Sequence, residues 1–288
     1  MSAIETYLDE LARALKVRGA PRRRFLRESR DHLLDAAGER GEREAVRTFG
    51  PPSEVAAAFD AEVATHRGLR ATSATTAAVL AVGGSTLVLI QAAAPGATAP
   101  TAWAIVFFIA AQIAGVAGAL AVVQALAHRR ETLEPADAAL LVRRNACALV
   151  AAALTMFAAG AAVPGSASAI LLLAGPALAC VAAVGVLRAR SLARRLDGSK
   201  AHVARPPLAD LRQLTGLPVP ALDPLRLLAL TTCAAAAAAF ARDLLERATL
   251  GGALVTAAIE AVAVLGGFAV LGRALGLTAG REVRARSG

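Results

Sequence analysis

Aromatic residues are scarce in this chain of 288 residues, at 3%, although 56% of the residues are hydrophobic. Ring side chains dominate the cores of soluble proteins, so an apolar fraction made chiefly of Ala, Leu and Val indicates a membrane protein. Lysine is nearly absent too, occurring only at Lys16 and Lys200. The excess of arginine over lysine and the recurring alanine runs are typical of a high-GC bacterial genome.

Cysteine is equally rare, and Cys147, Cys180 and Cys233 all lie in apolar stretches, where a thiol behaves as a small hydrophobe. The sequence therefore predicts neither a disulfide framework nor a metal cluster. Its four histidines are scattered, without the close pairing that zinc ligation requires. Phosphate-binding loops, nucleophile elbows and paired carboxylates inside apolar segments are missing as well. We expect no enzyme activity, no cofactor and no bound metal.

The beginning of the chain, MSAIETYLDELARALK, lacks the pattern of a signal peptide, which needs a basic start followed by an unbroken apolar run. Glu5, Asp9 and Glu10 interrupt the apolar residues instead. We therefore expect this N-terminus to be retained, in the cytosol.

The net charge of +9 is not spread evenly. Residues 1–70 hold 13 basic and 12 acidic side chains, whereas residues 188–226 hold eight basic and three acidic, and the tail from Arg273 holds four and one. Basic loops beside apolar segments are typical of the cytosolic face of a membrane protein. Direct binding of nucleic acid is therefore not expected.

Six apolar stretches have about the length that a membrane span needs, roughly 20 residues. They cover residues 71–94, 102–127, 145–163, 169–187, 225–241 and 250–272. Their charged connections alternate with nearly uncharged ones, which predicts three helical hairpins with both termini in the cytosol. The sequence thus predicts an all-α protein of the bacterial plasma membrane, with a six-helix transmembrane bundle in residues 69–288.

Residues 1–68 have a different pattern and predict a small cytosolic module of four helices. In the first helix, an apolar stripe recurs at helical spacing: Ile4, Leu8, Leu11 and Leu15. A second helix is expected from Pro21 to Gly38, with an inner stripe of Phe25, Ser29, His32 and Ala36 beside Leu33. The segment EREAVRTF predicts a short third helix.

The corner FGPPSEVAAAF leads into the fourth helix, which presents Val55, Phe59 and Val63 to the others. Gly50 can adopt a left-handed conformation that closes a helix, and Pro51 and Pro52 prevent its continuation. Ser53 is then expected as the N-cap. These residues thus have local structural reasons for their places as well as a possible role in contact with a partner.

The pattern YLDELARALK…RRRFLRESRDHLLDAA…EAVRTFGPPSEVAAAF resembles the HAAS domain, a small helical signalling module at the head of multi-spanning bacterial membrane proteins. Relatives of this class are frequently encoded beside PadR-type transcriptional regulators, and similar modules precede some permease-like proteins. The resemblance implies a cytosolic protein partner, with a PadR-type regulator as the first one to test. The candidate docking residues are Arg23, Arg27, Arg30, Phe49, Gly50, Pro51, Pro52 and Ser53.

Two polar residues interrupt the apolar spans, Gln112 in the second and Glu260 in the sixth. Both would lie at about the same depth in the bilayer. An ionised carboxylate is costly there, so we expect Glu260 to be protonated or paired. A hydrogen bond between the two that fixes the bundle, and a proton or ligand site, are both compatible with the sequence.

Two functions follow from these observations. The first is a cytosol-facing regulatory membrane protein, whose module binds a partner while the spans anchor it or sense through the membrane. The second is a small transporter or permease subunit with a regulatory module. Homo-oligomers are compatible with either.

Overall fold

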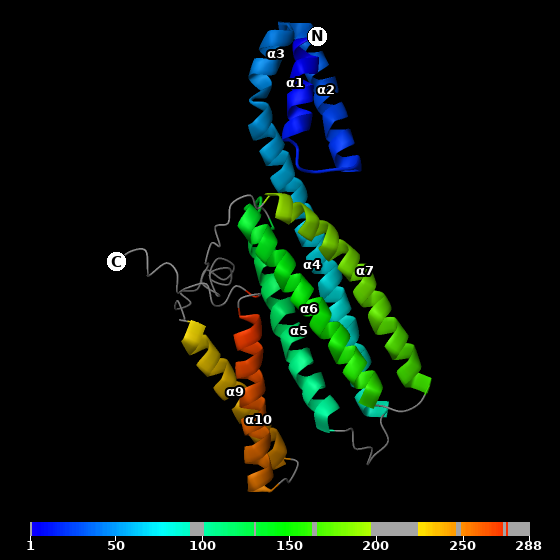
Figure 1. Ribbon diagram of the computed structural model, residues 1–288, viewed down its shortest axis with the longest axis vertical. Helices are drawn as coiled ribbons and strands as arrows, with labels where there is room; N and C mark the ends of the chain where they lie inside the picture. The colour runs from blue at the N-terminus through cyan, green and yellow to red at the C-terminus, as the bar shows by residue number, and fades with distance from the viewer. Residues whose placement is uncertain are drawn as a thin grey trace, which may run out of the picture.

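The computed structural model describes residues 2–92, 101–129, 131–162, 166–196, 224–245, 249–272 and 275. Within these ranges the chain forms nine helices and no strand, which confirms the all-α class. The helices at the N-terminal end stand above a group of longer helices (Figure 1).

The module begins with α1 (Ala3–Ala14), α2 (Ala20–Arg40) and α3 (Glu42–Phe49). The expected end of the second helix at Gly38 is wrong, because α2 continues to Arg40 and stops at Gly41, where φ is +83°. A glycine inside a helix costs only about 1 kcal/mol relative to alanine, which is too little to end a helix that packs well on both sides. The left-handed conformation at Gly41 does end it, since few other residues adopt it.

The fourth helix, α4 (Pro52–Ala92), is 41 residues long and passes from the module into the bundle without a break. The predicted N-cap at Ser53 is wrong, because the backbone carbonyl of Pro51 already accepts a hydrogen bond from the N–H of Val55 at 3.1 Å. Pro52 fits the first helical position, where no backbone N–H is needed. At 1.5 Å per residue α4 is about 60 Å long, and it runs through residue 68, the expected domain boundary.

Five further helices follow: α5 (Thr101–Ala127), α6 (Pro135–Ala162), α7 (Ser166–Leu196), α9 (Pro224–Leu245) and α10 (Leu250–Leu271). Each of the six predicted spans coincides with a helix, although α10 ends one residue before the predicted end at Gly272. Residues 93–94 and 163, at the ends of two other spans, lie outside the described residues. Among the described residues, three segments are long and apolar enough to cross a membrane: Ile109–Ala127, Pro135–Ala161 and Leu250–Gly267.

In the described residues, the long helices pack as a group of four with a pair beside it. Helix α6 packs against α4, α5 and α7, so these four helices share a core. By contrast, α9 and α10 pack mainly on each other, and within the described part of the chain only α10 touches the four-helix group, through α5 (Figure 1). The bundle is thus a four-helix core with a hairpin beside it.

Most of the buried apolar residues in the four-helix core are alanines. One cluster joins Ala71 and Ala78 of α4 to Ala182 and Ala189 of α7. Such small residues let helix backbones approach closely. Large apolar side chains such as Leu80, Val150 and Phe157 face outward instead. This distribution is the one expected for helices surrounded by lipid, where burial of large side chains gives no advantage.

Candidate functional site on the N-terminal module

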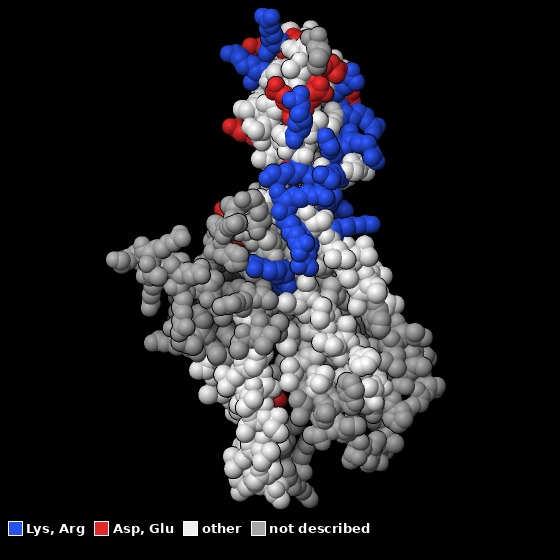
Figure 2. Space-filling view, in the orientation of Figure 1, with Lys and Arg blue, Asp and Glu red and all other residues white. Residues whose placement is uncertain are grey.

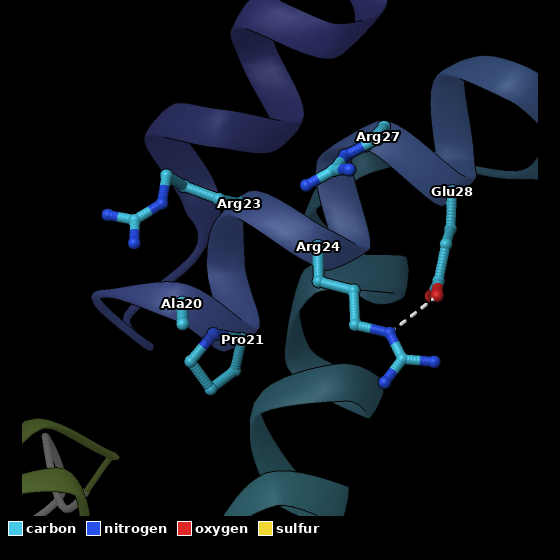
Figure 3. A pocket seen from close by; sticks show the side chains of 6 residues that line it. All are labelled: Ala20, Pro21, Arg23, Arg24, Arg27 and Glu28. Atoms are coloured by element: carbon cyan, nitrogen blue, oxygen red, sulfur yellow. Dashed lines mark hydrogen bonds and ion pairs between the residues drawn. The ribbon is translucent and has the colours of Figure 1, made fainter.

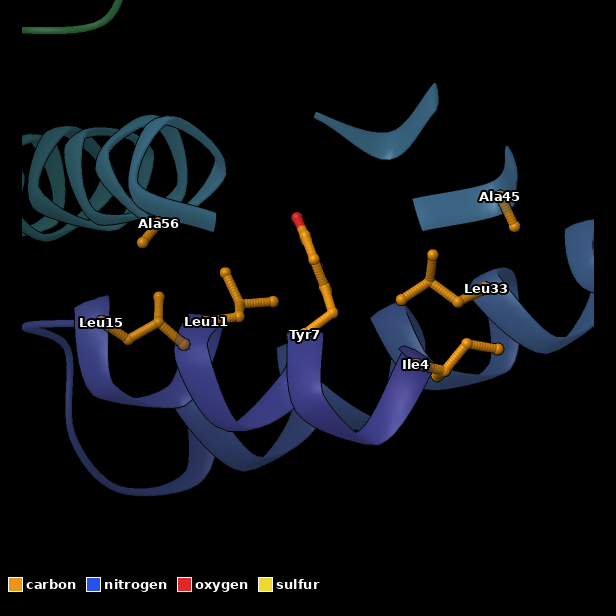
Figure 4. Packing of buried hydrophobic residues seen from close by; sticks show 7 residues of the cluster. All are labelled: Ile4, Tyr7, Leu11, Leu15, Leu33, Ala45 and Ala56. Carbon is orange, nitrogen blue, oxygen red and sulfur yellow. The ribbon is translucent and has the colours of Figure 1, made fainter. Parts of the chain in front are cut away.

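The core of the module is a row of apolar side chains along α1 that meets α2, α3 and the first turns of α4 (Figure 4). Ile4, Leu11 and Leu15 are buried as predicted, and Leu8 is half-buried. Tyr7, which the apolar stripe did not include, is buried too. The predicted inner position of His32 is wrong: the side chain is exposed, with its ring edge-on to Phe49 at a centroid distance of 6.2 Å. Leu26, six residues earlier on α2, packs on the core instead.

Three of the candidate docking residues follow one face of α2. Arg23, Arg27 and Arg30 are all exposed and lie at i, i+4 and i+7 on the helix. Leu34 continues this line and is 51% exposed. The outward face of α2 is therefore basic, with one large apolar side chain at its end.

The arginines of this face differ in their partners. Arg30 forms an ion pair with Glu5 of α1, with 2.6 Å between Nη2 and Oε1. For Arg23 and Arg27, no acidic partner lies within ion-pair distance among the described residues. The latter two guanidinium groups are thus available to a partner, whereas Arg30 also links α1 to α2.

A surface hollow of about 590 Å³ opens at the first turns of α2 (Figure 3). It is lined by Ala20, Pro21, Arg23, Arg24, Arg27 and Glu28. Arg24 and Glu28 form an ion pair at 2.7 Å within it, and this hydrogen bond raises the pKa of the Arg24 guanidinium. With three guanidinium groups and one carboxylate, the hollow suits an acidic group of a partner.

The remaining candidates form the corner between α3 and α4, and the structure shows what holds them. The hydroxyl of Tyr7 donates a hydrogen bond to the carbonyl of Gly50 at 3.0 Å. The ring of Phe49 packs edge-on against Tyr7, with the centroids 5.7 Å apart. Gly50 has φ +99° and ψ 173°, a conformation that is almost restricted to glycine. This confirms the expected role of Gly50 in closing the helix.

The structure does not bring the two groups of candidates into one site. The hollow lies beside the connection between α1 and α2, at the end of the module that faces the bundle, whereas the corner lies toward the other end (Figure 1). Pro51 and Ser53 expose their side chains at the corner, and Pro52 is half-buried. Docking through the α2 face and docking through the corner are therefore separate hypotheses.

Asp60 on α4 is a residue that the sequence analysis missed. Its carboxylate is 2% exposed and accepts hydrogen bonds from the backbone N–H groups of Lys16 and Val17, at 2.8 and 2.9 Å. The helical spacing pointed to a buried position for Asp60, because Asp60 lies one turn from each of two apolar residues that are buried, Ala56 and Ala64. A carboxylate on the buried face of a helix needs donors, and the connection between α1 and α2 supplies them.

The module is also attached to the end of α7. Val17 and Ala64 pack against Leu192, and Leu196 lies beside them. A guanidinium nitrogen of Arg195 lies 3.5 Å from the carbonyl of Lys16, at the limit of hydrogen bonding. The position of the module over the bundle is thus set by α4 and α7 together.

In the apolar region, the side-chain amide of Gln112 on α5 donates a hydrogen bond to the carboxylate of Glu260 on α10. The pairing expected from their equal depth is therefore present, and it joins the hairpin to the four-helix core. A second polar group was not anticipated. Arg144, 3% exposed, donates to the side chain of Gln124 at 2.8 Å and to the carbonyl of Leu275 at 3.3 Å.

Comparison with known proteins agrees with the resemblance seen in the residues. Residues 6–58 match the family model of the HAAS domain, a range that covers α1, α2, α3 and the beginning of α4. The chain thus carries a HAAS domain at its N-terminal end. Searches of curated proteins and of solved structures give no match to the chain.

Proposed function

We propose that this protein is a regulatory membrane protein whose HAAS domain docks a cytosolic protein partner. One observation carries the proposal. The region that matches the HAAS family ends within α4, and α4 continues as a single helix into the apolar bundle. A partner bound to the module would therefore be connected to the membrane part by a continuous helix. A PadR-type regulator is the first partner to test, on the strength of the family resemblance.

The charges of α2 support a partner with an acidic surface. Arg23 and Arg27 line the hollow with their guanidinium groups toward solvent (Figure 3). Leu34 adds an apolar contact further along the same face. Protein interfaces commonly combine apolar contacts with charges that steer the approach of the partner.

For the membrane part we propose six spans, with both termini in the cytosol of a bacterium. Support comes from the three helices that are long and apolar enough to cross a bilayer and from the basic loops between spans. Reporter fusions test this arrangement. Fusions at Ala97, Gly165 and Thr249 should report the outer side, and fusions at Pro135, Lys200 and Gly288 the cytosol. Any exchange of sides contradicts the six-span topology.

The docking proposal is tested by purifying the full-length protein from bacterial membranes and identifying the cytosolic proteins that stay bound. We expect a transcriptional regulator to be retained by the wild-type protein and lost after Arg27→Glu. Arg43→Glu is the matched control, because Arg43 is also an exposed arginine of the module but lies on α3. If no cytosolic protein is retained, and deletion of residues 1–68 changes no phenotype, then the transporter or permease function takes the place of this proposal.

A further inference from the structure

A group of arginines lies at the junction of the module and the bundle. Basic side chains gather in a belt at this level, above a surface of the long helices that is mostly free of charged residues where the structure describes it (Figure 2). Where α4 packs on α7, Arg67 of α4 lies near Arg188 and Arg195 of α7. We call these three residues the α4–α7 arginine cluster.

The packing of α4 on α7 fixes this cluster. Ala71 and Ala189 are buried between the two helices, and Ala64 and Leu192 are buried one to two turns further toward the module. Arg67 lies on α4 between Ala64 and Ala71, so it sits at the edge of this contact. Arg188 and Arg195 are seven residues apart and therefore share one edge of α7.

The charges of the cluster are not balanced within the described part of the protein. Arg67 is half-buried, and no carboxylate of that part lies within ion-pair distance of any of the three guanidinium groups. Partial burial, and then the charges of Arg188 and Arg195, lower the pKa of Arg67. Like charges at close range raise the energy of the site, and an anion bound between them relieves this cost.

The surface below the cluster is apolar and follows the same edge of α7. Val181 and Val184 lie seven and four residues before Arg188, which places them on the same side of the helix. Their side chains are 73% and 48% exposed. A ligand that met both features would need a negative group beside the arginines and a hydrocarbon chain along the valines. Free phosphate has only the first of these.

We propose that the α4–α7 arginine cluster binds the phosphate of an anionic phospholipid from the cytosolic leaflet, with an acyl chain along Val181 and Val184. This inference depends on the membrane placement proposed above. Because Arg195 also reaches the carbonyl of Lys16 and α7 packs on Val17, a bound lipid would sit against the base of the HAAS domain. The lipid composition would then affect how firmly the module is held.

The test uses the full-length protein purified in a neutral detergent and measures its melting temperature with added lipid. Phosphatidylglycerol should raise the melting temperature, whereas phosphatidylcholine and inorganic phosphate at equal concentration should not. In the pair variant Arg67→Gln with Arg188→Gln, the concentration of phosphatidylglycerol that gives half of the shift should rise roughly tenfold or more, since each basic residue near an anionic surface contributes measurably to lipid binding.

The matched control is Arg190→Gln with Arg194→Gln. It removes the same number of charges from the membrane-proximal part of the protein, but both residues lie on the other edge of α7. The control should keep the wild-type response. Equal losses in the two pairs would mean diffuse attraction and would overturn the inference. An equal shift with inorganic phosphate would indicate a simple anion site and would overturn it too.

Two further measurements keep the outcomes separate. The variant Arg67→Gln with Arg188→Gln could fail to fold. In that case Arg67→Lys with Arg188→Lys is used, which retains the charges. The number of phosphatidylglycerol molecules bound to it is counted by native mass spectrometry in place of the melting curve. Carbonate washing of native membranes shows whether the protein is integral. A protein that is washed off contradicts the proposed function as well. A protein that stays but shows no preference for phosphatidylglycerol contradicts only the lipid site.

Discussion

The carboxylate of Asp60 accepts a hydrogen bond from the backbone N–H of Val17 at 2.9 Å, and both residues are almost fully buried. This contact joins the connection between α1 and α2 to the helix that enters the bundle. The contact lies where α4 packs both on the core of the module and on the end of α7. A change in the module that moves this connection therefore acts directly on α4.

Replacing Asp60 with alanine should free the connection between α1 and α2. The N–H groups of Lys16 and Val17 lose their acceptor, and a buried donor left unpaired costs about 1 to 3 kcal/mol. We expect faster hydrogen–deuterium exchange in peptides covering residues 15–19 of the full-length protein, and a loss of roughly 2 kcal/mol in the stability of the module.

Glu62→Ala is the control for this change. Glu62 is an exposed acidic residue on the same helix, and it lies 3.8 Å from His66 of the next turn as an ion-pair contact. Exposed pairs of this kind contribute less than about 1 kcal/mol, so exchange in residues 15–19 should not change. If both variants exchange alike, the hydrogen bonds of Asp60 do not hold the connection.

Two glycines of the module should respond to alanine in opposite directions. Gly50→Ala should destabilise the module by roughly 1 to 3 kcal/mol, because φ +99° with ψ 173° is strained for any side chain. Gly38→Ala should stabilise it by about 0.5 to 1 kcal/mol, since Gly38 is inside α2 and a Cβ there meets no atom within 4 Å. Denaturant unfolding followed by circular dichroism measures both. A stabilised Gly50→Ala would contradict the observed corner.

Much of the fold could be predicted because it depends on local patterns. The stripe of Ile4, Leu11 and Leu15 fixes the buried face of α1, and apolar runs of membrane length locate the long helices. The end of α2 was misplaced because the sequence holds two glycines three residues apart, Gly38 and Gly41. Only the second is left-handed, and that choice depends on where α3 must begin.

The tertiary contacts of the site were harder to foresee. Asp60 binds backbone groups more than 40 residues away, and such partners leave no residue pattern. The separate position of the α9 and α10 hairpin was missed for a different reason. Spans rich in alanine resemble one another, so their composition does not say which of them pack together. Gln112 and Glu260 could be paired from sequence because polar residues at equal depth are rare in a membrane.

The single tyrosine provides a pH-dependent test of the module. Burial raises the pKa of Tyr7 above its usual value of about 10, since the neutral phenol is favoured in the folded state. The stabilisation from the buried phenol is complete below that usual value and is lost as the pH rises through the raised pKa. Helix content and phenolate absorbance of the full-length protein should therefore change together at alkaline pH.

Tyr7→Phe removes the phenol hydroxyl and keeps the buried ring, so it separates the effect of the hydroxyl from that of apolar packing. It removes the hydrogen bond to the carbonyl of Gly50 and should lower stability at neutral pH by about 1 kcal/mol. The variant should also lose most of the alkaline transition. If the wild-type protein and Tyr7→Phe melt at the same alkaline pH, another group causes the transition and Tyr7 is not the site that titrates.

The hydrogen bond between Gln112 and Glu260 is expected to hold the hairpin of α9 and α10 on the four-helix core. Glu260→Gln keeps a hydrogen-bonding side chain and should be nearly silent, whereas Glu260→Leu should weaken the contact by about 0.5 to 2 kcal/mol. Spin labels on α5 and α10 should show a broader distance distribution in Glu260→Leu and in Gln112→Leu. The double variant should lose no more than either single one, because both remove the same bond.

Thr256→Val is the control, one turn before Glu260 on the same helix. The hydroxyl of Thr256 bonds to the carbonyl of Gly252 within α10, so its removal should leave the distances between α5 and α10 unchanged. Glu260→Gln also distinguishes a structural carboxylate from a functional one. If this variant keeps its helix distances and its stability but loses partner retention or ion-dependent growth, the carboxylate handles a proton or cation, and the transporter function becomes the better account of the membrane part.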